Sequence, residues 1–574
     1  MTSRLWTGLQ ASALALAVIA TAPAAGAQGL AGPYLAGSQA DLRDDYLPAS
    51  RYYDDAIRVA SEDASLLNAA MVVNVIAGRL NRGLDMARRL EPVDGANQLV
   101  SLTLLAEALR DEDYAAARRM AEDPARQLNP MFAQLVEGWS RIGEGDFAGG
   151  VAVFEGMSGN AAVEIYGKVH LAYAHAFAGD FETAARILDG DDDSPLHVDR
   201  LTIATHLVSL SQIDRGSDAL ELVDRLLANG GADPQLEQMR ERLLAGEALE
   251  FDQIARPADG AASAYAVLAD ALLREDALRL SLFYGRLATH IRPRYDQVTA
   301  LIADILAEQR QYELAIATYE EVAPGSPWYI AAEIGRAAAL DGAGRHDEAI
   351  EVLSKLSRER PDVISVHNAL GDTLRNNEEF ARAAEAYSRA VELIEEPAQQ
   401  HWRLFYVRGI SYERTDEWDK AEADFRTALE LNPEQPNVLN YLGYSLVELR
   451  RNMDEALDMI ERAVAQRPQD GYITDSLGWV YYRLDRFDEA VGPMERAVEL
   501  EPVDPVINDH LGDVLWKVGR KMEARFQWRR ALSFEPEEDE AVRIRRKLDA
   551  GLDKVLAEEA AIGEEKTAET ASGN

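Results

Sequence analysis

Residues 472–502 read YITDSLGWVYYRLDRFDEAVGPMERAVELEP, and this stretch decides the fold. Apolar residues such as Leu477 recur in it at the spacing of one helix face. Gly478 and Ala490 are small enough to let two antiparallel helix backbones approach closely. Pro502 cannot continue the preceding helix, because proline lacks a backbone N–H and clashes with the previous turn. The stretch therefore predicts a helix–turn–helix unit that a proline closes.

The closing proline recurs along the chain at nearly constant spacing. Successive members of this set lie 34 to 36 residues apart. A fixed period of this length indicates stacked supersecondary units, each too small to bury its own apolar face. The prolines of the set are Pro293, Pro327, Pro361, Pro397, Pro433, Pro468, Pro502 and Pro536.

The unit at 472–502 resembles the tetratricopeptide repeat, whose pattern runs W-x2-L-G-x2-Y, then A-x3-F, A and P. The resemblance implies an all-α, right-handed superhelical solenoid of about fourteen helix–turn–helix units, arranged in two superhelical segments. It also implies a protein that holds other proteins. In the C-terminal half, the glycine of the pattern recurs as Gly371, Gly409, Gly443 and Gly512.

Weaker copies precede the regular array, with small and aromatic residues at the same offsets in Gly37 and Tyr53 and in Gly138 and Phe154. The rhythm breaks between Asp233 and Ser263. We therefore expect the following parts: a signal peptide at 1–27, a degenerate N-terminal repeat-like superhelix at 28–232, an irregular joint at 233–261, a regular repeat array at 262–536, a capping helix at 537–558 and a disordered acidic tail at 559–574.

The N-terminal segment predicts export from the cytoplasm. Arg4 supplies a positive charge, residues 11–20 are apolar, and residues 25–27 form a small-residue cleavage site. The expected location is the periplasm or the cell exterior, as a soluble chain after cleavage. An uncleaved N-terminal anchor is the alternative, although the apolar stretch is short for spanning a membrane.

Charge and cysteine usage exclude several function classes. The formal net charge is −40, and such a surface repels nucleic-acid phosphates and anionic membranes. The chain contains no cysteine, so disulfides, thiolate zinc sites and cysteine nucleophiles are excluded. No motif for a phosphate loop, a zinc protease or a nucleophile elbow occurs. We expect no enzymatic activity, no cofactor and no metal, the alternative being an accessory subunit with catalytic residues in the joint.

The first helix of each unit is expected to line the concave groove of the superhelix. Residues three before, one after and four after the glycine of the pattern point away from the seam between the two helices. Aromatic side chains beside Asp or Asn at these positions would form a cradle for a bound peptide. The alternative is that the aromatic side chains pack between adjacent repeats. The candidate partner-binding residues are Asn368, Asp372, Arg375, Asn440, Tyr444, Asp475, Trp479, Tyr482, Asp509, Asp513 and Trp516.

Three stretches, 475–484, 505–516 and 524–531, resemble a family of long bacterial envelope repeat proteins. One type in that family is a lipoprotein adaptor that binds a periplasmic C-terminal processing protease and presents cell-wall hydrolases to it. The resemblance implies a periplasmic scaffold that recruits a protease or its substrates. This chain departs from the adaptor because it has no cysteine to carry a lipid. The alternative is an assembly factor for secretion, pili or surface polymers. The partner, the oligomeric state and any binding of the groove to the chain's own tail stay open.

Overall fold

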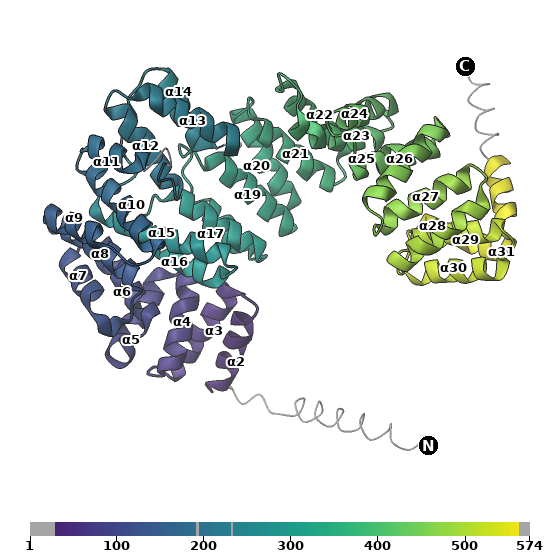
Figure 1. The fold of residues 1–574 in the computed structure, drawn as a ribbon. Coiled ribbons are helices and arrows are strands. Elements are labelled where there is room, and N and C mark those ends of the chain that lie inside the picture. Colours follow the sequence, from purple (N-terminus) through teal and green to yellow (C-terminus); the bar gives the residue numbers. More distant parts are fainter. Residues whose placement is uncertain (1–28, 191–194, 231–232, 562–574) are drawn as a thin grey trace. The chain divides into compact units, whose positions relative to one another are not determined.

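Antiparallel pairs of helices follow one another in the computed structural model (Figure 1). The structure describes residues 29–190, 195–230 and 233–561, and no strand occurs in these ranges. The predicted signal peptide at 1–27 lies outside the described residues, as do residues 562–574 of the predicted tail. The all-α repeat fold expected from the sequence is confirmed.

Two compact units divide the chain, Met1–Leu356 and Ser357–Asn574. The helices that begin in the first unit are α2 (Ala31–Asp41), α3 (Tyr46–Val59), α4 (Ala64–Ile76), α5 (Leu80–Asp94), α6 (Gln98–Arg110), α7 (Tyr114–Glu122), η1 (Pro124–Arg126), α8 (Pro130–Gly143), α9 (Phe147–Gly156), α10 (Ala161–Phe177), α11 (Phe181–Asp189), α12 (Arg200–Gln212), α13 (Gly216–Gly230), α14 (Pro234–Leu244), α15 (Pro257–Arg274), α16 (Leu278–Ile291), α17 (Asp296–Glu308), α18 (Tyr312–Tyr319), α19 (Tyr329–Gly342) and α20 (His346–Glu359).

The second unit continues the same alternation, and residues 552–561 are helical after its last named helix. Its helices are α21 (Ile364–Asn376), α22 (Phe380–Glu392), η2 (Gln399–His401), α23 (Trp402–Glu413), α24 (Trp418–Leu431), α25 (Pro436–Glu448), α26 (Met453–Gln466), α27 (Gly471–Arg483), α28 (Phe487–Leu500), α29 (Pro505–Lys517), α30 (Lys521–Ser533) and α31 (Glu538–Ala550).

The small residue in the first helix of a hairpin faces a large side chain of the second helix. A Cβ added at Gly371 would lie 2.4 Å from the ring of Tyr387, and one at Gly512 would lie 2.4 Å from Trp528. Real Cβ atoms do not come this close, so each glycine is required by the close packing of its hairpin. The same relation joins Gly37 to Tyr53, Gly138 to Phe154, Gly409 to Phe425, Gly443 to Ile460 and Gly478 to Met494.

A residue with left-handed backbone geometry ends the first helix of each hairpin. The residues recur about every 34 positions through most of both units, the period of the repeat. Turn geometry therefore marks the N-terminal repeats that the proline spacing did not reveal, including the α4–α5 hairpin. The left-handed turn residues are Asp44, Gly78, Glu112, Gly145, Gly179, Asp214, Asp276, Arg310, Gly344, Glu378, Asp416, Arg450, Asp485 and Gly519.

The segment 233–261, expected to be an irregular joint, lies inside the first unit. It contains α14, followed by a left-handed residue at Gly246, but no second helix completes the hairpin. A non-helical stretch replaces that helix and buries Leu249 and Ile254. The chain then enters α15 at Pro257. The boundary between the two compact units lies inside α20, at Leu356. It is nearly 100 residues further along the chain than the predicted joint at 233–261.

Helices α15 and α16 pack back onto the N-terminal hairpins, which explains why the first unit extends so far. Helix α15 contacts α8, α6 and α10, while α16 contacts α6 and α4 (Figure 1). The Tyr265 hydroxyl donates a hydrogen bond of 2.9 Å to the carbonyl oxygen of Leu102. Arg286 is buried and donates to the carbonyl oxygen of Ile76. The inner face of the N-terminal hairpins is therefore covered by the chain itself.

Trp139 stands at the centre of this packing and is fully buried. Its indole Nε1 donates a hydrogen bond of 2.8 Å to Nδ1 of His170, which must therefore be unprotonated at that nitrogen. Burial lowers the pKa of His170 from 6.5 to about 3. Burial likewise lowers the pKa of His290 to about 4. Both side chains are neutral in the folded unit at neutral pH.

The first unit is expected to lose stability as the pH falls below about 6.5. Below that pH the two histidines bind protons in the unfolded chain but stay neutral in the folded unit. Each buried histidine therefore lowers the free energy of unfolding by about 2 kcal/mol between pH 7 and pH 5. Urea unfolding followed by pulse proteolysis, with mapped fragments, measures this loss. A His170→Gln variant should show a weaker pH dependence, whereas His346→Gln, at an exposed histidine, should keep that of the natural chain. Equal stability at pH 7 and pH 5 would contradict the expectation.

No helix within the described ranges is both long and apolar enough to cross a membrane. The same ranges contain no group of three or more His, Cys, Asp or Glu side chains able to hold a metal ion.

Candidate protein-binding site

The predicted groove residues lie on the first helices of four hairpins in the second unit. The structure places Asn368, Asp372 and Arg375 on α21, Asn440 and Tyr444 on α25, Asp475, Trp479 and Tyr482 on α27, and Asp509, Asp513 and Trp516 on α29.

The α21 residues form one network with the neighbouring hairpin. The Asp372 carboxylate accepts hydrogen bonds from the Tyr387 hydroxyl at 2.8 Å and from Nη2 of Arg403 at 3.2 Å. Nδ2 of Asn368 lies 3.5 Å from the same carboxylate. Nε of Arg375 donates to the Tyr387 hydroxyl at 3.3 Å. These polar groups therefore connect α21 to α22 and α23.

The α27 residues form an aromatic stack that reaches α29. The Trp479 ring lies 4.8 Å from that of Tyr482 and 4.0 Å from that of His510, nearly parallel to both. Nδ1 of His510 lies 2.9 Å from the Asp475 carboxylate. Burial disfavours the charged imidazole, but the carboxylates of Asp475, Asp509 and Asp513 together outweigh the effect of burial and raise the pKa of His510. Nε1 of Trp479 donates to Oε1 of Glu448 at 2.6 Å.

The α29 carboxylates bind a lysine of the following helix. Nζ of Lys547, on α31, lies 2.6 Å from Asp509 and 2.7 Å from Asp513. The Lys547 side chain is fully buried. Burial and repulsion from Asp513 raise the pKa of Asp509 to about 6, although Lys547 opposes the shift. Nε1 of Trp516 donates to Asp553 at 2.9 Å, in the helical stretch after α31.

Six of the eleven predicted groove residues therefore link their own hairpin to the helices that follow it, namely Asp372, Asp475, Trp479, Asp509, Asp513 and Trp516. Trp479, Tyr482 and Trp516 are each less than 10% exposed, and α31 with residues 552–561 covers the last hairpin as a cap. The sequence predicted a capping helix but not its contacts with Asp509 and Asp513. Partner binding by these residues stays a prediction.

A recess of about 450 Å³ opens beside the aromatic stack. We call it the second-unit recess. Its apolar wall consists of Trp479, Tyr482, Phe487, Met453 and Leu556. Its charged lining consists of Arg450, Arg483, Lys517, Arg543, Asp485 and Glu559.

Basic side chains dominate this recess, in contrast to the net charge of −40 of the whole chain. Arg483 pairs with Glu448 at 2.9 Å, Lys517 pairs with Asp553 at 2.8 Å, and Arg543 pairs with Glu559 at 3.0 Å. Arg450 is exposed, and no carboxylate of the described residues lies within ion-pairing distance of it. Sequence reasoning missed these cations, because they come from a turn and from three different helices and form no motif.

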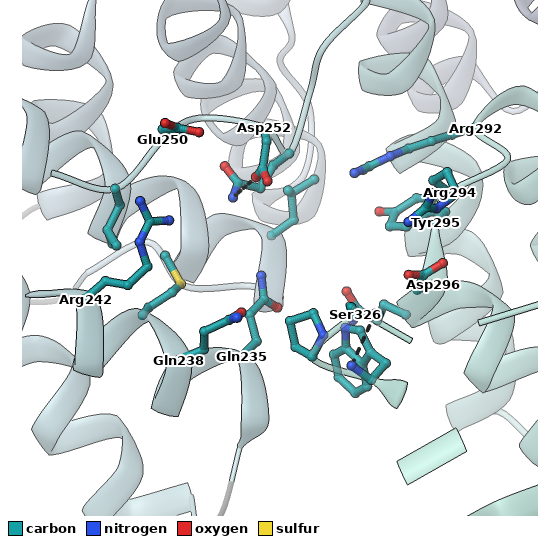
Figure 2. A pocket seen from close by; sticks show the side chains of 18 residues that line it. Gln235, Gln238, Arg242, Glu250, Asp252, Arg292, Arg294, Tyr295, Asp296 and Ser326 are labelled. Carbon is teal, nitrogen blue, oxygen red and sulfur yellow. Dashed lines mark hydrogen bonds between the residues drawn. The ribbon is translucent and has the colours of Figure 1, made fainter. Parts of the chain in front are cut away.

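The first unit contains two adjoining cavities, which share Leu201, Tyr295, Gln297 and Trp328. We call them together the first-unit cleft. Its polar half, of about 470 Å³, lies between α14 with the stretch after it and the turn from α16 to α17 (Figure 2). Its apolar half, of about 560 Å³, lies among α10, α12, α15, α17 and α19.

Comparison with known proteins confirms the repeat type. Three family models, all described as tetratricopeptide repeat, match residues 288–372, residues 364–397, and residues 406–471 with 450–505. The C-terminal part of the chain, from residue 288 to residue 505 apart from a short gap, therefore contains tetratricopeptide repeats, a repeat class that generally mediates contacts between proteins.

Similar proteins share only part of their length with this chain. A TPR repeat-containing protein of Pseudomonas aeruginosa is 30% identical over 177 residues, which cover 31% of this chain and 29% of that protein. Human tetratricopeptide repeat protein 13 is 28% identical over 187 residues, covering 31% of this chain and 21% of that protein. The matched part is thus less than a third of each relative. The crystal structure of the APC/C hetero-tetramer Cut9–Hcn1 is also similar to this chain. The alignment covers 90% of this chain and 95% of the chain in that structure, with 14% sequence identity and a TM-score of 0.37.

Proposed function

We propose that the protein is a scaffold that binds other proteins, and that the second-unit recess receives an acidic segment of a partner. The observation that carries this proposal is the recess itself, in which four basic side chains surround an aromatic wall. A carboxylate of the partner would be bound by the basic groups, and an apolar side chain beside it would contact the aromatic wall. We assign the protein no reaction.

Arg450 is the strongest single contributor to this proposed specificity. The other three cations of the recess already pair with carboxylates of the chain, whereas Arg450 does not among the described residues. A partner carboxylate that binds Arg450 would therefore gain a charge-assisted hydrogen bond without breaking an existing ion pair.

The finer part of the proposal follows from the sequence resemblance to envelope repeat proteins. In this interpretation the protein lies in the periplasm and brings a processing protease together with its cell-wall hydrolase substrates. Holding both on one scaffold would raise their effective concentration. The alternative interpretation is an assembly factor for secretion, pili or surface polymers.

We expect Arg450→Glu to weaken partner binding about tenfold or more, since it replaces attraction by repulsion in the recess. Arg529→Glu, at an exposed arginine of α30 outside the recess, changes the net charge equally and should leave binding within about twofold. The experiment captures partners from the native envelope by crosslinking to three proteins: the natural chain, Arg450→Glu and Arg529→Glu. The captured partner is then titrated against each of the three. Capture of a processing protease would support the adaptor interpretation, and capture of secretion or pilus components the alternative. Equal binding by all three chains would overturn the role of the recess.

A further inference from the structure

The first-unit cleft is lined by more acidic than basic side chains, the reverse of the second-unit recess. We propose that it binds an extended peptide segment, whose backbone lies in the polar half and whose lysine or arginine side chain enters the apolar half. This inference does not depend on the second-unit recess, because it concerns other residues in another unit.

The apolar half fits the stem of a long basic side chain. Its walls include Val267, Val298 and Leu301, and small alanines of α15, α17 and α19 widen it. The rings of Tyr166 and Tyr319 also line it. Lysine and arginine bury their methylene stems along such surfaces while the charged head seeks a polar partner.

Asp304 supplies the polar partner for that head. The side chain lies on α17 and is exposed to the cavity. The Tyr319 hydroxyl donates a hydrogen bond of 2.6 Å to its Oδ1. Partial burial by the surrounding protein raises the pKa of Asp304, although the hydrogen bond from Tyr319 opposes the shift. A cation beside Asp304 would favour the charged form of the carboxylate and offset this partial loss of solvation.

The cations already present in the apolar half are engaged with other groups. Arg274 pairs with Asp270 at 2.7 Å. Arg200 pairs with Asp233 and lies 4.9 Å above the Trp328 ring. Among the described residues, no basic side chain lies within ion-pairing distance of Asp304 or of Glu275, which lines the same cavity. The cavity therefore has an excess of negative charge that a basic ligand would offset.

The polar half fits a peptide backbone. Four glutamines line it, Gln235, Gln238, Gln253 and Gln297, and an amide side chain offers both a donor and an acceptor. Gln235 and Gln238 lie on one side of the cavity and Tyr295 on the other (Figure 2). Oε1 of Gln253 is buried and accepts no hydrogen bond from any described residue. Peptide groups present the same pair of complementary functions at each residue, which favours a peptide over a free amine.

The test is selection from a displayed library of random heptapeptides on the full-length chain. We compare the natural chain with Asp304→Asn, which keeps the size of the side chain but removes its charge. Glu308→Gln is the matched control, because Glu308 is exposed on the same helix but does not line the cleft. Ala271→Phe provides a second variant, which fills the cavity from an exposed position of α15. Selected peptides are then titrated, with and without 1,5-diaminopentane as a competitor.

The natural chain and Glu308→Gln should select the same peptides, each with a lysine or arginine. Asp304→Asn and Ala271→Phe should bind these peptides at least about tenfold more weakly. Replacing the basic residue of a selected peptide by alanine should cause a loss of the same size. Selection without basic residues, or equal binding by Asp304→Asn, would overturn the proposal. Binding of 1,5-diaminopentane that is tighter than that of any selected peptide would also overturn it, in favour of a free diamine as the ligand.

Discussion

A Lys547→Met variant is expected to lose about 3–5 kcal/mol of the unfolding free energy of the second unit at pH 8. The Lys547 side chain is fully buried and bridges Asp509 and Asp513 at 2.6 and 2.7 Å. Methionine keeps the bulk of lysine but leaves two carboxylates close together without their cation. Urea unfolding monitored by pulse proteolysis of the second unit measures the loss. Lys554→Met, at an exposed lysine, should change stability by less than about 0.5 kcal/mol.

Two further measurements separate the loss of the ion pair from a general packing defect. The deficit of Lys547→Met should be smaller at pH 5 than at pH 8, because Asp509, whose pKa is already raised to about 6, then takes up a proton. Combining Lys547→Met with Asp509→Asn and Asp513→Asn should recover most of the stability, since the amide introduced by Asp513→Asn still offers an oxygen to Nε1 of Trp528. A deficit that is independent of pH and unrelieved by the asparagines would contradict this account.

Trp139→Ala is expected to cost the first unit about 3–5 kcal/mol, the range for deleting a buried aromatic side chain. Trp139 is fully buried between α8 and α15 and donates to His170. Gly260→Leu should also destabilise the unit by about 3 kcal/mol. A Cβ at Gly260 would lie 2.2 Å from the Trp139 ring. Urea unfolding of the first unit measures both effects.

The combination of the two changes tests whether α15 packs on α8 at this point. Leucine at position 260 would occupy part of the space that Trp139 leaves, so the double variant should lose at least about 1 kcal/mol less than the two single losses together. Gly156→Leu serves as the control, because a Cβ there meets nothing within 4 Å. Strictly additive losses would show that the two residues do not share one packing site.

The sequence was sufficient to predict the hairpins, because their determinants are local. Gly371 and Gly512 were expected to permit close helix packing, and each faces a ring sixteen residues further along the chain. The closing prolines, such as Pro433 and Pro502, lie in turns between hairpins as expected. The packing of α15 onto the N-terminal hairpins was not predictable. Gly260 and Trp139 are 121 positions apart, and no local sequence pattern at either residue indicates contact with the other.

The contacts of the predicted groove residues could not be read from the sequence, for a related reason. Helical spacing identified which side chains leave the seam, such as Asp475, Trp479 and Asp513. It could not show that His510 would pair with the Asp475 carboxylate, or that Lys547 would pair with the Asp513 carboxylate, since both partners lie on following helices. A polar stripe that binds a partner and one that joins repeats have the same spacing. The cations of the second-unit recess and the acidic cavity of the first unit arise only when several hairpins come together.

A photo-crosslinking amino acid placed at Met453, which lines the second-unit recess, tests the central claim most directly. The control position is Met522, which is 87% exposed on α30 and lies outside the recess. After irradiation in the native envelope, mass spectrometry identifies the crosslinked peptides. Our account predicts that position 453 gives an acidic segment of a partner protein, that position 522 does not, and that Arg450→Glu removes the product. The same products from both positions, or products at 453 that survive Arg450→Glu, would contradict it.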